Sequence, residues 1–310
     1  MRTEWVIHIW GKKRDNLEFT PQEKFHINMI KSCNHYIFDK VLINIAMDDI
    51  NDEKLFNFFK RELLDVFSDI KDIDIRKCQN DTMLCEYVTF RPYVWDRIGE
   101  DVRIFYSHFK GYVTNVRILR ESYPMRNILI NEYYWSYLMY RMLLGDEYIE
   151  EMTKSFNIGK CVYCWCLVDK TNFKHTLGED YYSSYFKCLE EIVPSVKNFY
   201  TKDSEYLHSP GSFVWYDMKN IYKHIGSVID EIKLDSEILN SVGLCSHFCE
   251  LYMWRFLNIE YIQEQTFINN MKNQINSIDN SIYTKLYCSK KICKEYIKDF
   301  ETYIKQYKII

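Results

Sequence analysis

The most informative stretch of the chain reads Ile104-Phe-Tyr-Ser-His-Phe-Lys-Gly-Tyr112. Its first half is apolar and aromatic, its second half carries His108 and Lys110, and the run breaks at Gly111. A short apolar run bounded by glycine is typical of a buried strand that ends in a loop. In open α/β sheets, ligands bind just beyond the carboxyl ends of such strands. We therefore expect a strand over residues 102–108 whose end forms the floor of a binding site.

Strand-like and helical patterns alternate on the N-terminal side of this stretch. Thr20-Pro21-Gln22-Glu23 has the features of a helix start, with Thr as N-cap, Pro in the first position and Glu as the partner in a capping box. Pro92 lies inside a helical pattern and predicts a kink or a late helix start. The expected strands are 6–10, 41–47, 73–76 and 102–108, and the expected helices are 20–33, 52–67 and 86–98. Such alternation predicts an α/β fold with a mostly parallel, Rossmann-like sheet.

The C-terminal part of the chain has a different pattern. Residues 160–167 and 210–216 are the last strands that we expect. Apolar residues then step by three and four positions, as in a coiled-coil seam, at Ile268, Met271, Ile275, Ile278 and Ile282. We expect a sheet domain over residues 1–257 and a helical extension over 258–310. The extension either packs on the domain, forms a homo-oligomer, or docks on a partner or membrane surface.

Composition excludes several classes of function. The net charge is −4 and no basic block stands out, so a nucleic-acid partner is not expected. No run of about 18 apolar residues predicts a membrane span, and the first residues do not have the pattern of a signal peptide. We expect a cytoplasmic protein with reduced cysteines, and the C-terminal helices would allow contact with the inner face of the membrane.

Three motifs that often carry chemistry are weak or missing. Neither the Gly-x-Gly-x-x-Gly fingerprint nor the Gly-x-x-x-x-Gly-Lys-Ser/Thr loop is present, which argues against a dinucleotide dehydrogenase and a P-loop enzyme. Cys161, Cys164 and Cys166 have knuckle-like spacing but lie in a strand-like run. Strand alternation would send Cys161 and Cys164 to opposite faces, so we favour strand cysteines over a zinc site.

Several segments, taken in order, resemble a known family. Residues 104–111 resemble the Leu-Tyr-Phe-His-Thr-Lys-Gly strand and loop of bacterial glycosyltransferase-like proteins from surface polysaccharide (capsular and lipopolysaccharide) gene clusters. Residues 135–140 resemble the Trp-and-Met helix of that family, and 208–216 resemble its His-x-Ser-Gly-Asn-Phe-Trp-Trp segment. The first strand, with His8, also fits. The resemblance covers about residues 4–257.

The resemblance implies a glycosyltransferase A-type domain. Such a domain takes a sugar from a nucleotide-sugar donor and passes it to a glycan or a lipid-linked glycan acceptor. Residues His108, Lys110, Gly111 and His8 would then bind the donor diphosphate. Where many A-type enzymes hold a divalent metal with Asp-x-Asp, this chain has Ser107-His108-Phe109-Lys110, so we expect a mechanism without a metal. Asp48 and Asp49, at another strand end, are the alternative site for Mn²⁺ or Mg²⁺.

The remaining site residues follow from the same resemblance. His208, Gly211, Ser212 and Trp215 would bind the sugar or the acceptor, with Trp215 in a stacking wall. Glu250 is the first candidate for the catalytic base, and Asp217 is the second. The alternative function is a non-catalytic, transferase-like binding or assembly protein that uses its C-terminal helices.

Overall fold

The computed structural model describes residues 1–82, 84–109, 139–140, 143–145, 149, 159–163, 191, 194, 213–226 and 260–263. These residues form a seven-stranded sheet with the order β3-β2-β1-β4-β6-β5-β7. The strands are β1 (Arg2–Gly11), β2 (Lys40–Met47), β3 (Asp72–Gln79), β4 (Val102–His108), β5 (Gly159–Tyr163), β6 (Val214–Asp217) and β7 (Glu260–Gln263). The predicted α/β class with a mostly parallel sheet is therefore confirmed for the described part of the chain.

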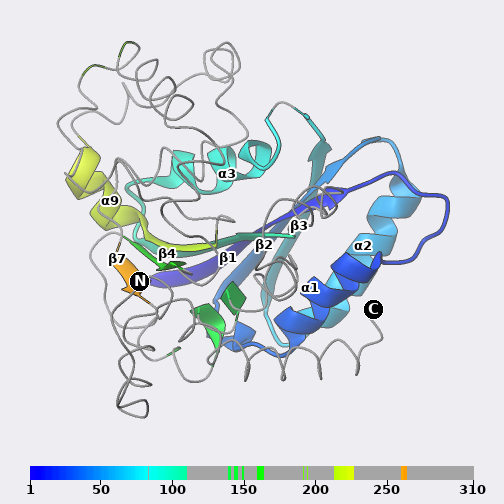
Figure 1. Cartoon of the computed structure of the whole chain (residues 1–310), viewed down its shortest axis with the longest axis horizontal. Helices are drawn as coiled ribbons and strands as arrows, with labels where there is room; N and C mark the ends of the chain where they lie inside the picture. Colours follow the sequence, from blue (N-terminus) through cyan, green and yellow to red (C-terminus); the bar gives the residue numbers. More distant parts are fainter. Residues whose placement is uncertain are drawn as a thin grey trace, which may run out of the picture.

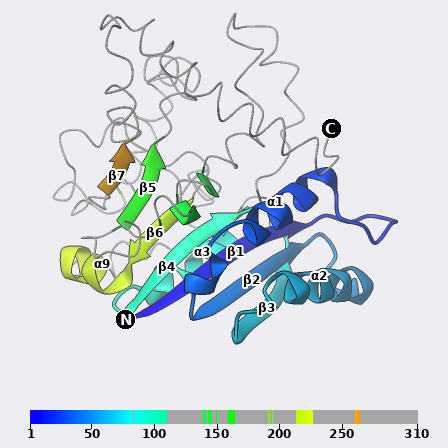
Figure 2. The same cartoon turned by 90° about the horizontal axis from the view of Figure 1, so that it is seen from below.

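One strand of the sheet runs against the others. β1 pairs in parallel with β2 and β4, and β2 pairs in parallel with β3. β6 is antiparallel to both β4 and β5, whereas β5 and β7 are parallel. Figure 2 shows β6, β5 and β7 continuing the sheet beyond β4.

The helices cover the two faces of the sheet differently. α1 (Pro21–Lys31) and α2 (Glu53–Val66) lie on one side, and α3 (Tyr87–Tyr93) lies on the other (Figure 1). The remaining helical elements are α9 (Met218–Ile225) and the short 3₁₀ helices η1 (His35–Ile37) and η2 (Trp95–Arg97). The sheet is thus covered from both sides, as its apolar strands require.

Sequence features fix the starts of α1 and α2. The Thr20 side chain accepts a hydrogen bond from Glu23 N, and the Glu23 carboxylate accepts one from Thr20 N, so the predicted capping box is confirmed. Asp52 caps α2 by accepting from Leu55 N at 3.0 Å. Pro92 lies inside α3, and α3 ends one residue later. The helix expected over 86–98 is therefore shorter, and a 3₁₀ turn follows it.

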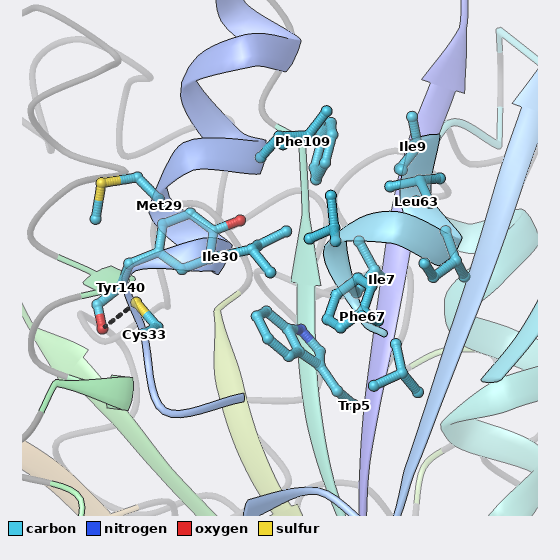
Figure 3. Packing of buried hydrophobic residues seen from close by; sticks show 14 of the residues in the cluster. Trp5, Ile7, Ile9, Met29, Ile30, Cys33, Leu63, Phe67, Phe109 and Tyr140 are labelled. Carbon is cyan, nitrogen blue, oxygen red and sulfur yellow. Dashed lines mark hydrogen bonds between the residues drawn. The ribbon is translucent and has the colours of Figure 1, made fainter. Parts of the chain in front are cut away.

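The main core lies between the sheet and α1 and α2. Odd-numbered residues of β1 (Trp5, Ile7 and Ile9) point into it and meet Met29 and Ile30 of α1 (Figure 3). Leu63 and Phe67 close the same core from α2 and the residue after it (Figure 3). Because strand side chains alternate, the even-numbered residues of β1 face α3. This alternation places His8 on the α3 face.

The sheet extends beyond the expected domain boundary at residue 257. β7 lies inside the segment 258–310, for which we expected helices, and it pairs with β5. A four-residue strand has too few positions for its period to stand out in a sequence that also carries helical spacing. The rest of that segment lies outside the described residues, as do residues 135–138 of the expected Trp-and-Met helix.

Candidate functional site

The order of the first four strands creates a natural binding edge. The chain goes from β1 to β2 to β3 through α1 and α2, and then crosses back through α3 to place β4 on the other side of β1. Because crossovers between parallel strands are right-handed, this reversal also moves the connecting helix to the opposite face. The carboxyl ends of β1 and β4 are therefore a topological switch point, which is where ligands bind in open α/β sheets.

Polar residues lie in one row across the sheet near this edge. His8 of β1 is in register with Asn44 of β2 on one side and with His108 of β4 on the other. Asn44 is in turn in register with Arg76 of β3. Three neighbouring strands thus bring His108, His8 and Asn44 together on the face that α3 covers.

The segment around α3 completes this row with hydrogen-bonding partners. Thr89 Oγ1 lies 2.7 Å from His8 Nδ1 and accepts a hydrogen bond from Asn44 Nδ2 at 2.8 Å. Glu86 Oε2 lies 2.7 Å from His108 Nδ1. We call these five residues (His8, Asn44, Glu86, Thr89 and His108) the switch-point cluster. All are buried except His108, which is partly exposed.

Burial controls the charge of His8. It is the largest influence and lowers the pKa of His8 from 6.5 to about 4, although the Glu86 carboxylate acts in the opposite direction. The neighbouring His108 lowers the pKa further. His8 is therefore neutral at pH 7, and it contributes hydrogen bonds rather than charge to the site.

The backbone before α3 holds an unusual conformation. Cys85 has a φ angle of +46°, in the left-handed region that residues with a Cβ rarely adopt. Glu86 follows it directly. Such conformations persist where the surrounding structure enforces them, often at binding sites. Here the turn at Cys85 positions the Glu86 side chain next to His108.

Asp48, one of the two alternative metal ligands, already has three hydrogen-bond donors around its carboxylate. The Asp48 carboxylate accepts hydrogen bonds from Trp10 Nε1 at 2.7 Å, from the Lys13 backbone at 3.0 Å and from Asn80 Nδ2 at 3.0 Å. These hydrogen bonds hold the Asp48 side chain in place after the end of β2. In the part of the chain that the structure describes, no three His, Cys, Asp or Glu side chains are grouped as metal ligands.

Asp217 lies away from the switch-point cluster. It is in register with Arg103 near the amino end of β4, whereas His108 is at the carboxyl end of that strand. Its carboxylate accepts from Asn220 N at 3.0 Å and so caps α9. The structure therefore assigns Asp217 a capping contact and does not bring it to the histidines.

Trp215 packs in the core instead of forming a stacking wall. Its side chain is 1% exposed, its ring stacks on Phe38 and Phe105, and its Nε1 donates to Leu143 O at 3.3 Å. The expectation that Trp215 contacts a sugar is corrected by this burial, because a core residue on the α1 side has no free face. Phe213, the residue before β6, is buried as well.

Six of the expected site residues lie outside the described residues. They are Lys110, Gly111, His208, Gly211, Ser212 and Glu250. Phe213 directly follows Ser212, and its ring centroid lies 6.0 Å from that of His108. The β6 strand therefore begins beside the same edge at which β4 ends.

Sequence reasoning found the two histidines of the cluster but missed Asn44, Glu86 and Thr89. The spacing of Glu86 and Thr89 by three residues is a detectable signal, because it puts two polar side chains on one face of a helix. Asn44 is a polar residue in the middle of β2, with apolar residues on both sides of it. A buried amide in such a strand needs a partner, and this points to a polar cluster.

Comparisons with protein-family models, with curated proteins and with solved structures found no match. None of the helices within the described ranges is long and apolar enough to cross a membrane.

Proposed function

We propose that this chain is a glycosyltransferase that moves a sugar from a nucleotide-activated donor to a glycan acceptor in cell-surface polysaccharide biosynthesis. The observation that carries the proposal is the switch-point cluster, where two histidines from neighbouring strands meet at the carboxyl edge of the sheet. This is the place where an α/β sheet binds a nucleotide. The reason to propose sugar transfer in particular is that residues 104–111 resemble a motif of glycosyltransferase-like proteins.

In this proposal the donor diphosphate binds beyond the ends of β1 and β4. Sugar transfer requires stabilisation of the leaving nucleoside diphosphate and removal of a proton from the acceptor hydroxyl. His108 and Lys110 would contact the diphosphate, and Glu250 would take the proton. The neutral His8, held by Thr89, would support His108 without adding charge to the site.

Ligand-induced stabilisation tests the binding part of the proposal. A ligand present at one hundred times its Kd stabilises a protein by about 2.7 kcal/mol. We expect at least one of UDP, GDP, dTDP or CDP, at millimolar concentration, to raise the melting temperature of the wild-type chain. A flat response to every nucleotide would contradict the proposal.

A pair of lysine variants tests the diphosphate contact. Lys110→Ala should remove the nucleotide-induced shift and abolish sugar transfer while the far-ultraviolet circular dichroism spectrum stays unchanged. Lys60→Ala, at an exposed position on α2, is the matched control and should behave as wild type. Nucleotide binding without transfer from any nucleotide sugar would favour the non-catalytic alternative.

A further inference from the structure

The contact between Glu86 and His108 sets the direction of the imidazole. Glu86 Oε2 lies 2.7 Å from His108 Nδ1. A carboxylate accepts hydrogen bonds only, so the proton on the ring must reside on Nδ1. Glu86 is the residue before α3, yet its side chain makes no capping hydrogen bond to that helix. Its carboxylate is directed to the histidine instead.

The other ring nitrogen of His108 is left for a ligand. Nε2 is buried and has no hydrogen-bond partner within the part of the chain that is described. A buried polar atom without a partner is costly and calls for an explanation. His108 is also the most exposed member of the switch-point cluster. A ligand at this edge would supply the missing partner.

The two histidines of the cluster have different partners: His108 contacts the Glu86 carboxylate, and His8 contacts the Thr89 hydroxyl. Among the described residues, the ionisable groups near the Glu86–His108 contact are His8 from β1, Tyr106 from β4, and Cys85, which precedes Glu86. Burial keeps His8 neutral at pH 7. Among the contacts between described residues, the Glu86 carboxylate lies 2.7 Å from His108 Nδ1, which places a negative charge beside that ring.

We propose that Glu86 is a positioning residue: its carboxylate fixes His108 through Nδ1–H and stabilises the imidazolium whose Nε2–H donates to a diphosphate group. The inference rests on the proposed function, because it names how that site holds the diphosphate. The second proton on the ring comes from solvent. The imidazolium then supplies positive charge next to the phosphate oxygens.

The first experiment examines the protein without ligand. Nitrogen-15 spectra of the histidine side chains, with the His108 signals identified by their loss in His108→Gln, report which ring nitrogen carries the proton. We expect protonated Nδ1 in wild type at pH 8. Glu86→Gln, which keeps the shape of the side chain, should change the His108 signals. Tyr106→Phe is the matched control, because the Tyr106 hydroxyl lies 3.4 Å from the same carboxylate oxygen and its removal leaves the Glu86 carboxylate in place.

The second experiment measures binding of inorganic pyrophosphate, the group that all nucleoside diphosphates share, by calorimetry from pH 6 to pH 8. At pH 8 the Glu86→Gln variant should bind about tenfold more weakly than wild type, the usual scale for a hydrogen bond to a charged group. The difference should shrink at pH 6, where solvent protons restore the imidazolium. Pyrophosphate binding to His108→Gln, measured over the same pH range, shows how much of the pH dependence comes from protonation of pyrophosphate itself.

The outcomes separate this inference from the proposed function. Unchanged His108 signals in Glu86→Gln would overturn the positioning role, whatever the protein binds. A Glu86→Gln defect of equal size at pH 6 and pH 8 would also overturn it, since a purely structural loss has no reason to recover with acid. Absence of binding of pyrophosphate and nucleotides to wild type, with the expected His108 signals, would overturn the proposed function and the diphosphate assignment and leave only the orientation of His108 by Glu86.

Discussion

The Thr89 hydroxyl lies between His8 Nδ1, at 2.7 Å, and Asn44 Nδ2, at 2.8 Å. One side chain of α3 therefore joins two strands of the sheet at the edge where the site forms. All three residues are buried, so water cannot replace a contact that is lost. This arrangement makes the cluster a part of the fold as well as a candidate site.

The role of Thr89 can be measured by removing its hydroxyl. Thr89→Val keeps the shape of the side chain and leaves two buried polar groups without their partner. We expect a loss of about 1–3 kcal/mol in the free energy of unfolding, measured by urea denaturation at pH 7. Thr89→Ser, which keeps the hydroxyl, should lose clearly less. Equal losses in both variants would point to packing of the methyl group as the cause.

The lowered pKa of His8 predicts a dependence of stability on pH. Burial lowers this pKa from 6.5 to about 4, so the unfolded chain binds a proton at a higher pH than the folded protein does. The contribution of His8 to the free energy of unfolding is therefore fully present above pH 6.5 and is lost as the pH falls toward 4. The loss is at most about 1.4 kcal/mol for each pH unit.

A His8→Asn variant isolates that contribution. Asn can keep a hydrogen bond to Thr89 but does not titrate. The difference in unfolding free energy between wild type and the variant should change between pH 6.5 and pH 4, in urea titrations at several pH values. Parallel curves over that range would show that His8 does not have the lowered pKa.

The left-handed backbone at Cys85 predicts an unusual benefit from glycine. This conformation has a free-energy cost of roughly 1–2 kcal/mol for a residue with a Cβ, and glycine does not have this cost. Cys85→Gly should therefore be more stable than Cys85→Ala by about 1 kcal/mol, although glycine is normally the less favourable of the two. Both variants lose the contact from the thiol to Thr82 O, so thermal unfolding of the pair compares the backbone alone. A more stable alanine variant would contradict the positive φ angle.

Asp48 connects Trp10 of β1, the loop after β1 at Lys13 and Asn80 after β3, so it should contribute more to stability than Asp49. Burial alone would raise the pKa of Asp48, but hydrogen bonds from Trp10, the Lys13 backbone and Asn80 together lower it. A carboxyl group whose pKa is lowered on folding stabilises the fold at pH values above its ordinary pKa. This stabilisation is lost as the pH falls through the pKa of the folded state.

Asp48→Ala should accordingly cost about 1 kcal/mol at pH 7, and less at pH 3, in urea denaturation. Asp49→Ala is the control, since the exposed Asp49 accepts only a local bond from Asn51 N among the described contacts. If Asp49→Ala were as costly as Asp48→Ala, the contacts to Trp10 and Asn80 would not be the source of the effect.

The sequence predicted those features that local chemistry determines. The capping box at Thr20 and Glu23 depends on residues three positions apart, so it can be read without knowledge of the fold. The strand that ends at His108 was predicted with its bounds because its apolar run is interrupted by polar residues. The position of β4 beside β1 was not predictable from such patterns, since strand order depends on contacts between distant segments.

Features that depend on tertiary partners were missed. Glu86 resembles an ordinary charge at a helix start, and only the fold shows that its carboxylate reaches His108. The first strand begins at Arg2, earlier than expected, because its residues pair with β4 from Arg2 onward. Nothing in the four residues of β6 indicates that the strand runs antiparallel, and its direction follows from its partners β4 and β5.

The reversed direction of β6 has an evolutionary consequence. The chain leaves β4 at Phe109 and enters β6 at Phe213, and both residues are anchored in the core beside the same edge of the sheet. Between these two anchors, Met139, Tyr140, Leu143 and Leu144 pack in the same core and β5 pairs with β6, so variation there is constrained at these positions. Insertions, deletions and substitutions elsewhere in this part of the chain leave the two anchors in place, because a packed core tolerates less variation than the surface does. Diversification of ligand choice among descendants of this chain would then concentrate between Phe109 and Phe213, with the switch-point cluster left unchanged.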